Sequence, residues 1–454
     1  MSRRVVITGA GVISSIGTGA DEFWRQCLQA RSVVAPIPER WLQYADLRSR
    51  LWTPLPDYDS ESFGITRIEK LQLDPVSVLA ISAAHQALEN AGLQMTRSSV
   101  QSRALTLTGI DSTRVGVHLG TGIGGAHSFL ENHAQHLYQR AHASLKLYAD
   151  QYATGSGREI LDKSLAFMSY PPRYHPFVVS MLMPNAPSAA VGIKFSFTGP
   201  NVTYCVACAS GTVAVGHAYR AVSNGDVDIC LAGGSEYLYD EHGHIFRGFD
   251  VAGTLARDAV DPQTVNRPFD ERRTGFLFSQ GGAAALVLEE LEHAQRRGAT
   301  IIAELIGFAE TFDAHSMMSL APDGKQIERM IRTAVADAGL TPPDIDYINT
   351  HGTGTRNNDE TEAHVIQRVF GKSALINSTK SLLGHTIGAS GAFEALVTAL
   401  SLRDGKTHIC KNLEVPLLDL NFVRRVEQND LEVGLSQSFA FGGHNAALVL
   451  RRFS

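Results

Sequence analysis

The amino-acid sequence predicts an α/β protein built from two similar halves. Short apolar runs that end in glycine alternate with segments of helical periodicity in both the first and the second part of the chain. The apolar runs contain few polar residues, which indicates buried, mainly parallel strands. The chain of 454 residues is too long for one ordinary core, so we expect one half over residues 1–265 and another over 266–454.

The boundaries of single elements follow from local signals. We predict a helix over residues 74–93, because Asp74 can cap its N-terminus, Pro75 suits the first helical position and Gly92 lies near its end. A second helix is predicted over 325–340. The predicted strands are residues 4–11, 114–122, 227–236, 282–290, 301–311 and 345–354.

Residues 126–175 interrupt the alternation of strands and helices. This segment is rich in His and Tyr and has its own helical periodicity, so we expect a helical insertion. Its histidines raise the question of a metal site, but no acidic or cysteine partner stands at a clean ligand spacing. We interpret them as packed or solvated residues: His127, His133, His136, His142 and His175.

Composition and charge argue against several classes of protein. The chain has 40 basic and 46 acidic residues, a net charge of −6, so we expect no nucleic-acid or membrane partner. No run of apolar residues is long enough for a membrane span. Residues 3–17 resemble a signal peptide but are broken by glycines, and we interpret them as a buried strand and turn. Five cysteines, an odd and sparse set, favour reduced thiols in the cytoplasm.

Cys205 and Cys208 stand at the spacing of a redox pair or half a zinc site. We expect a strand over 202–206 and a helix over 209–223, which places only Cys208 at the junction where backbone N–H groups favour an anion. Such a position lowers a cysteine pKa from about 8.5 towards roughly 3.5–7.5. No second Cys or His pair stands at finger-like spacing. On this stretch alone, a reactive thiolate and a buried structural cysteine both remain open.

Two histidines stand in similar surroundings further along the chain. His351 ends an apolar strand and enters a loop of Gly and Thr, and His385 follows Gly384 at another junction. Lys380 and Glu394 flank His385, and a Phe-Gly-Gly turn follows near the C-terminus. A lone histidine is usually a packed or surface residue, but two in such loops beside a candidate nucleophile indicate a catalytic set.

Together, these residues resemble the β-ketoacyl-[acyl carrier protein] synthases, condensing enzymes of the thiolase-like fold. The resemblance runs from VVITGAG near the N-terminus through ACASG, NRPFDERRTGF and HGTGT to KSLLGH and FAFGG. It implies two α/β halves in an α-β-α-β-α arrangement. It also implies acyl transfer to Cys208, then decarboxylative condensation with a malonyl carrier to a 3-oxoacyl carrier, in fatty-acid or in polyketide or polyene biosynthesis.

The resemblance assigns a role to each matching residue. His351 and His385 bind the malonyl thioester oxygen, while Lys380 and Glu394 orient them. The backbone N–H groups of Cys208 and Phe441 form an oxyanion hole, and Phe441 also acts as a gate. The remaining matches contact the pantetheine arm (Thr353, Thr355, Gly442, Gly443) or, on the surface, the acidic carrier (Arg67, Lys70).

The resemblance also bears on cofactors and partners. Asn349, Glu394 and Ser436 resemble a monovalent-cation site, although Gln437 stands where relatives have Asn, so a structural Na⁺ or K⁺ is an open expectation. No other cofactor is expected, since 4′-phosphopantetheine belongs to the carrier. The expected partners are an acyl carrier protein, acyl and malonyl thioesters, and a second subunit in a homodimer or heterodimer.

Two other functions fit the same motifs less well. A non-catalytic, chain-length-determining subunit of a heterodimer typically loses the nucleophile, whereas Cys208 is present here. A thiolase acting with coenzyme A has a second catalytic cysteine near the C-terminus, where this chain has FGGHN. The sequence therefore favours the synthase and leaves its acyl chain and its pathway open.

Overall fold

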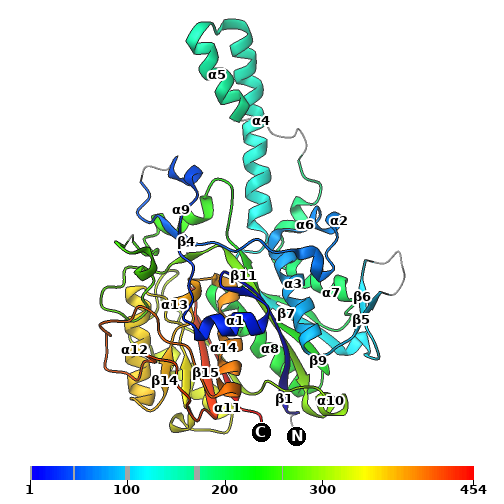
Figure 1. Cartoon of the computed structure of the whole chain (residues 1–454), viewed down its shortest axis with the longest axis vertical. Helices are drawn as coiled ribbons and strands as arrows, with labels where there is room; N and C mark the ends of the chain where they lie inside the picture. The colour runs from blue at the N-terminus through cyan, green and yellow to red at the C-terminus, as the bar shows by residue number, and fades with distance from the viewer. Residues whose placement is uncertain (1–2, 44–45, 98–102, 168–173, 258) are drawn as a thin grey trace.

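The computed structural model describes residues 3–43, 46–97, 103–167, 174–257 and 259–454 (Figure 1). An 11-stranded sheet runs through the molecule, in which the short strand β2 (Gly17–Thr18) pairs with β1 beside the main path. From one edge to the other, that path is β14 (Leu375–Asn377), β13 (Tyr347–Asn349), β15 (Val433–Phe439), β16 (His444–Arg451), β12 (Ala303–Phe312), β1 (Val5–Ser14), β11 (Gly281–Glu290), β9 (Ile229–Tyr237), β7 (Val115–Gly120) and β8 (Asn201–Tyr204).

The sheet consists of two five-stranded halves with mirrored strand order, in agreement with the predicted two similar halves. They meet where Val5–Ile7 of β1 pair antiparallel with Ala303–Leu305 of β12. The prediction of mainly parallel strands is wrong, because only β8, β7 and β9, and their counterparts β14, β13 and β15, run parallel. β9, β11 and β1 alternate in direction, as do β15, β16 and β12. Both faces of these strands are buried, so their apolar runs carry no signal of direction.

Helices on three levels complete the predicted α-β-α-β-α arrangement. The central pair, α8 (Ser210–Asn224) and α14 (Ser390–Asp404), pack against each other and against strands of both halves. The outer helices α3 (Pro75–Asn90) and α11 (Lys325–Asp337) cover β1 and β12. The predicted N-cap of α3 is confirmed, since the Asp74 carboxylate accepts a hydrogen bond from the Val76 N–H at 2.9 Å.

The smaller elements lie around this layered body. Apart from the helices of the insertion, the remaining α-helices of the described residues are α1 (Ala20–Leu28), α2 (Arg67–Lys70), α6 (Val178–Leu182), α7 (Ala186–Phe195), α9 (His244–Val251), α10 (Leu291–Arg296), α12 (Arg356–Phe370) and α13 (Lys380–Leu383). The remaining strands are β3 (Ala35–Pro36), β4 (Leu51–Thr53), β5 (Met95–Arg97), β6 (Leu105–Leu107) and β10 (Phe278–Ser279). β11 begins after the predicted boundary at residue 265, yet it lies between β1 and β9 in the sheet of the first half.

The two halves repeat the same turn before their central helices. Ala207 and Ile387 both adopt a left-handed conformation, with φ of 48° and 47°, which is uncommon for residues with a side chain. Each is the first residue of a short 3₁₀ turn, which leads into a helix that begins with Ser-Gly. Cys208 and Gly388 therefore occupy equivalent positions in the two halves.

The predicted insertion forms a helical arm that projects from the body (Figure 1). α4 (Ala126–Tyr152) is followed by α5 (Gly155–Phe167), and Arg158 joins the two through the Ala149 carbonyl and the Asp150 carboxylate. The histidines of α4 make ordinary contacts: His127 donates to the Tyr239 carbonyl and His133 stacks on Phe129. Among the described helices, none is both long and apolar enough to cross a bilayer.

Candidate active site

The candidate nucleophile lies in a cavity of about 440 Å³. Both halves contribute, because Cys208 comes from the first and the loops around His351, His385 and Phe441 from the second. The other lining residues lead from the sulfur towards the surface: Gly253, Thr254, Arg257, Thr274, Gly275, Phe276, Met318, Ser319, Leu320, Thr353, Thr355, Arg356, Asn357, Asn358, Phe439 and Ala440.

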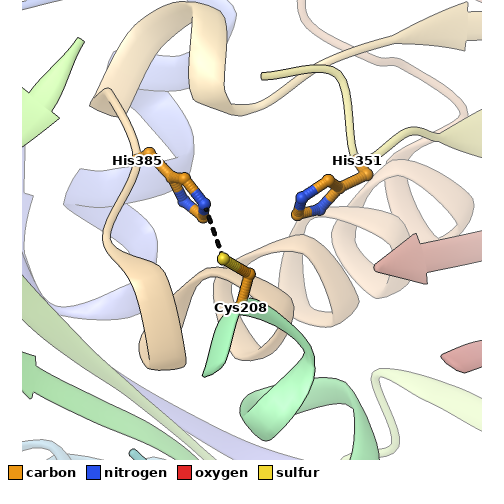
Figure 2. Close-up of side chains that lie close together, drawn as sticks. All are labelled: Cys208, His351 and His385. Carbon is orange, nitrogen blue, oxygen red and sulfur yellow. Dashed lines mark hydrogen bonds between the residues drawn. The ribbon is translucent and has the colours of Figure 1, made fainter. Parts of the chain in front are cut away.

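Cys208, His351 and His385 face one another in this cavity (Figure 2). The Sγ atom of Cys208 lies 3.1 Å from Nε2 of His385, and one ligand atom from each of the three residues lies within 4.8 Å of the others. The two imidazole rings are 5.6 Å apart and nearly perpendicular. All three side chains are at most 5% exposed. The predicted convergence of this set is therefore confirmed.

Neighbouring donors fix the protonation of both histidines. The backbone N–H of Ile387 donates to Nδ1 of His385 at 3.3 Å, and the Lys380 ammonium donates to Nδ1 of His351 at 3.2 Å. Burial, and the charge of Lys380, hold the pKa of each imidazole well below its usual value. Each ring is therefore neutral with its proton on Nε2, facing the cavity. Two N–H donors suit a carbonyl or enolate oxygen, whereas a metal ion would require bare nitrogens.

The pKa of Cys208 differs from the sequence prediction. Burial raises it to about 12, although Lys380 and the backbone N–H of Phe441 act in the opposite direction. The predicted lowering is wrong, because the loss of hydration outweighs the Lys380 charge and the Phe441 N–H. The resting nucleophile is a thiol. Cys205 lies just beyond β8, is exposed, and its thiol donates to the Gly122 carbonyl at 3.3 Å.

This raised pKa has a measurable consequence for cysteine alkylation. Below the pKa, the thiolate fraction grows about tenfold per pH unit, so alkylation of Cys208 by iodoacetamide should accelerate from pH 7 to pH 9 without a plateau. Mass spectrometry of the peptide that contains Cys208, in a Cys205→Ala background, measures this rate. A plateau below pH 8 would show that the sulfur is ionised at rest.

Lys380 and Glu394 form a buried ion pair behind His351. Both side chains are at most 2% exposed, and the ammonium contacts the Glu394 carboxylate and Nδ1 of His351. Burial raises the pKa of Glu394, while Lys380 and the Ser438 hydroxyl lower it. Glu394 therefore holds the Lys380 ammonium next to Nδ1 of His351, where it fixes the orientation of the ring. This position agrees with the predicted placement of the two residues beside the histidines.

Two carboxylates that the sequence analysis missed support the His351 loop. Glu362 accepts hydrogen bonds from the N–H groups of His351 and Gly352 at 2.7 and 2.8 Å, and Asp359 accepts from Thr353 and Gly354 at 3.1 Å. Both carboxylates are buried. Their spacing of three residues places them on one face of α12, a signal that was present in the motif RNNDETEA but was not used.

The remaining predicted residues of the second half lie at or near the cavity. The hydroxyls of Thr353 and Thr355 are 2.9 Å apart, and both residues line it. Phe441 also lines it, and its N–H interacts with the Cys208 sulfur. Gly442 and Gly443 have φ of 87° and 88°, a conformation that glycine adopts without strain.

Charged residues at the surface fall into two groups. Arg257 and Arg356 line the cavity, are exposed, and form no ion pair within the described part of the chain; the sequence analysis did not single them out. The predicted docking residues Arg67 and Lys70 belong to α2, which lies across the molecule from α12 in Figure 1. Arg67 is exposed, whereas Lys70 pairs with Glu61 at 3.3 Å.

The residues of the expected cation site are only partly satisfied by protein. Asn349 Oδ1 and Ser436 Oγ are buried and have no hydrogen-bond partner within the described ranges. They share one side of neighbouring strands, and Ser438 on the same side donates to Glu394 at 3.3 Å. Gln437 points to the other side, where it donates to Glu362 at 2.8 Å. Asn349, Glu394 and Ser436 thus carry the oxygen ligands that a hard cation prefers.

Comparisons with known proteins agree with this site. Residues 2–294 match the model of the β-ketoacyl synthase N-terminal domain, and residues 302–414 match that of the C-terminal domain. A 3-oxoacyl-[acyl-carrier-protein] synthase 2 from Synechocystis sp. is 34% identical over 99% of this chain and 98% of its own length.

Solved structures give the same result. A β-ketoacyl synthase from Burkholderia phymatum superposes with a TM-score of 0.81 at 29% identity, with full coverage of both chains. A type II polyketide ketosynthase, solved in complex with its acyl-carrier protein and bound to a hexaketide, reaches 0.79 at 27% identity, also with full coverage. The fold, the convergent Cys–His–His set and these matches together place the chain in the β-ketoacyl synthase family.

Proposed function

We propose that this protein is a 3-oxoacyl-[acyl carrier protein] synthase that condenses an acyl group with a malonyl unit. The observation that carries the proposal is the Cys208 thiol opposite two imidazole N–H donors in one buried cavity. A sulfur nucleophile can hold an acyl group, and two fixed donors can stabilise an enolate oxygen.

The first step is acyl transfer to Cys208. The sulfur attacks the carbonyl carbon of an acyl thioester, a new C–S bond forms, and the bond to the carrier sulfur breaks. The thiol proton leaves with the carrier sulfur, so the buried site gains no net charge. The backbone N–H groups of Phe441 and Cys208 donate hydrogen bonds to the oxyanion that develops on the thioester oxygen. The contact between the Phe441 N–H and the sulfur supports this role.

The second step forms the carbon–carbon bond. The bond between the malonyl α-carbon and its carboxylate breaks, CO₂ leaves, and the electron pair forms an enolate whose oxygen accepts from Nε2–H of His351 and His385. The α-carbon attacks the carbonyl carbon of the Cys208 thioester, a C–C bond forms, the C–S bond to Cys208 breaks, and the released thiolate takes up a proton from solvent. Thr353 and Thr355 bind the pantetheine arm, and Phe441 with Gly442 and Gly443 acts as a gate between the two steps.

The proposed partners are an acyl carrier protein and a second copy of the chain. The carrier is supported by the solved ketosynthase that binds one. A homodimer is supported by β8, which forms a ladder with β7 alone in the described part of the chain and exposes Val202 at the sheet edge. Five free cysteines support a cytoplasmic location. The alternative, a non-catalytic chain-length subunit, is not favoured because Cys208 and both histidines are in place.

Mass spectrometry of the reaction products tests this function. The enzyme is mixed with acyl carriers of several chain lengths and with a malonyl carrier. We expect an acyl adduct on Cys208 and a 3-oxoacyl carrier that is two carbons longer than the acyl group supplied. Coenzyme A thioesters serve as the comparison. A preference for these thioesters, with cleavage of a 3-oxoacyl group, would instead indicate a thiolase.

Carrier docking predicts a salt-dependent KM. Reversal of charge in Arg257→Glu/Arg356→Glu should raise the KM for carrier substrates about tenfold at low salt. Both arginines line the cavity and form no ion pair within the described residues, so they can bind an acidic carrier. Arg67→Glu/Lys70→Glu should raise it less, since Lys70 is already paired with Glu61. The effects should shrink as the salt concentration rises. An unchanged KM for either double variant would remove that pair from the docking surface.

We also propose a structural Na⁺ or K⁺ held by Asn349, Glu394 and Ser436, where it would supply positive charge to the unpartnered oxygens. Potassium chloride should then raise the Tm by about 1–2 °C relative to tetramethylammonium chloride at equal ionic strength. Ser436→Ala should abolish the difference. Equal Tm values in both salts for the wild-type protein would argue against the ion.

A further inference from the structure

Glu236 is a fully buried carboxylate near the active site with no part in the proposed chemistry. It lies on β9 and forms no ion pair within the described residues. Its two oxygens accept four hydrogen bonds from neutral donors: the Thr121 hydroxyl at 3.1 Å, and the backbone N–H groups of Gly122 at 2.5 Å, Ile123 at 3.3 Å and Gly388 at 2.9 Å.

The surrounding backbone leaves room for this carboxylate and for little else. A Cβ atom on Gly122 or on Gly388 would lie 2.6 Å from Oε2 of Glu236. Both positions therefore require glycine so that the backbone can approach the Glu236 carboxylate, although neither glycine has a positive φ. Burial raises the pKa of Glu236 to about 7, while the four donors lower it. The site is built to hold a carboxylate between two turns that come from different halves of the chain.

One of these turns fixes the protonation of His385. Gly388 follows Ile387, whose φ of 47° is strained for a β-branched residue. The N–H of Ile387 donates to Nδ1 of His385 and keeps the proton of that ring on Nε2. The hydrogen bond from Gly388 to Glu236 anchors the residue next to Ile387, so Glu236 stabilises the strained conformation.

The other turn is connected to the nucleophile. The hydroxyl of Ser210, at the start of α8, shares its proton between the carbonyls of Ala207 at 2.7 Å and Thr121 at 3.1 Å, and it accepts from the Val206 N–H at 2.9 Å. Residues 206 and 210 flank Cys208 on both sides. Through Thr121, Glu236 is therefore connected to the turn that carries the sulfur as well as to the turn beside His385.

From these contacts we infer that Glu236 is a positioning residue for condensation, an inference that rests on the proposed function. Its carboxylate holds the Ile387–Gly388 turn so that Nε2 of His385 presents a proton to the thioester oxygen. When Glu236 cannot accept four hydrogen bonds, Ile387 relaxes and Nδ1 loses its backbone donor. Nδ1 is then left with the Ser390 hydroxyl at 3.0 Å, which can accept as well as donate, so the imidazole proton moves towards Nδ1 and Nε2 becomes an acceptor.

The main test is Glu236→Gln, with Glu289→Gln as the matched control. The amide keeps the size of the side chain but replaces one of the two acceptor oxygens with an NH₂ group. This group is a donor and cannot accept the hydrogen bonds of the surrounding N–H groups. Glu289 is an equally buried carboxylate on β11, at the opposite end of the ladder that pairs Gly282 with Glu236, and it binds Thr8 and Arg297. Both variants should lower the Tm.

Only Glu236→Gln should lower the kcat of malonyl decarboxylation, by about 10²-fold, with KM within about threefold of the wild-type value. Alkylation of Cys208 should persist. Thr121→Val removes one donor to Glu236 with little change in shape and should lower kcat by about three- to tenfold. If Glu236→Gln does not fold, Thr121→Val tests the positioning role of Glu236.

A second readout does not depend on activity. In ¹⁵N-histidine NMR spectra, with His385 assigned by His385→Gln, the wild-type ring should carry its proton on Nε2 and the Glu236 variant should shift it towards Nδ1. If kcat or this spectrum is unchanged in Glu236→Gln, or in Thr121→Val where the first variant is unfolded, the inference is overturned. Absence of decarboxylation in the wild-type enzyme would instead refute the proposed function, and the spectra would still test the role of Glu236.

Discussion

Replacement of Cys208 by alanine should abolish acyl transfer and lower the kcat of condensation by at least about 10⁴-fold, because Cys208 is the one thiol among the described residues that line the cavity. The intact mass of the protein after incubation with an acyl carrier shows whether an adduct forms. Cys208→Gln should lose condensation as well, yet decarboxylate a malonyl carrier, since the Nε2–H donors of His351 and His385 remain in place.

Cys205→Ala is the matched control, because this cysteine lies only three positions away and is exposed. Its variant should load an acyl group within about threefold of the wild-type rate. An adduct on Cys208→Ala that disappears when Cys205 is also replaced would move the nucleophile to Cys205. His351→Ala tests the donors themselves: decarboxylation as fast as in Cys208→Gln would show that His351 does not bind the enolate oxygen.

Lys380→Met should have the largest effect on stability among the residues of the active site. It removes the ammonium partner of the buried Glu394 carboxylate, which costs about 3–5 kcal/mol. It also removes the donor that keeps the proton of His351 on Nε2, so malonyl decarboxylation should fall by about 10²-fold. Thermal unfolding and a decarboxylation assay measure the two effects separately.

The double variant Lys380→Met/Glu394→Gln separates stability from catalysis. Removal of both charges should recover most of the lost stability, because neither position then leaves its former partner as an uncompensated charge. Decarboxylation should stay low, since the methionine cannot donate to Nδ1 of His351. Full activity in the double variant would show that the ion pair only stabilises the fold.

The sequence predicted much of the fold and the site because the relevant signals are local. The Asp74 cap, the strand that contains Val5–Ser14 and the turn of Gly442 and Gly443 all depend on a few neighbouring residues. Cys208, His351 and His385 each follow a strand, and resemblance to a known family brought the three together. Their mutual distances could not be read from any one segment.

The errors arose where the result depends on the surroundings in three dimensions. A helix N-terminus indicates a lowered pKa for Cys208, but complete burial reverses the direction. Strand direction is invisible in apolar runs that helices cover on both faces, as the antiparallel pairing of β1, β9 and β11 shows. Glu236 and Glu362 look like ordinary acidic residues in the sequence, and only the fold brings their donors to them.

The division of the active site between the two halves has a consequence for how the enzyme matures. During synthesis the ribosome releases the sulfur long before the imidazoles and the Phe441 amide exist. A nascent chain therefore carries an incomplete reaction centre, and folding of the second half supplies the imidazole donors and the Phe441 N–H. Acyl transfer and condensation thus require the complete and folded chain, so shortened or half-folded products would not consume acyl carriers.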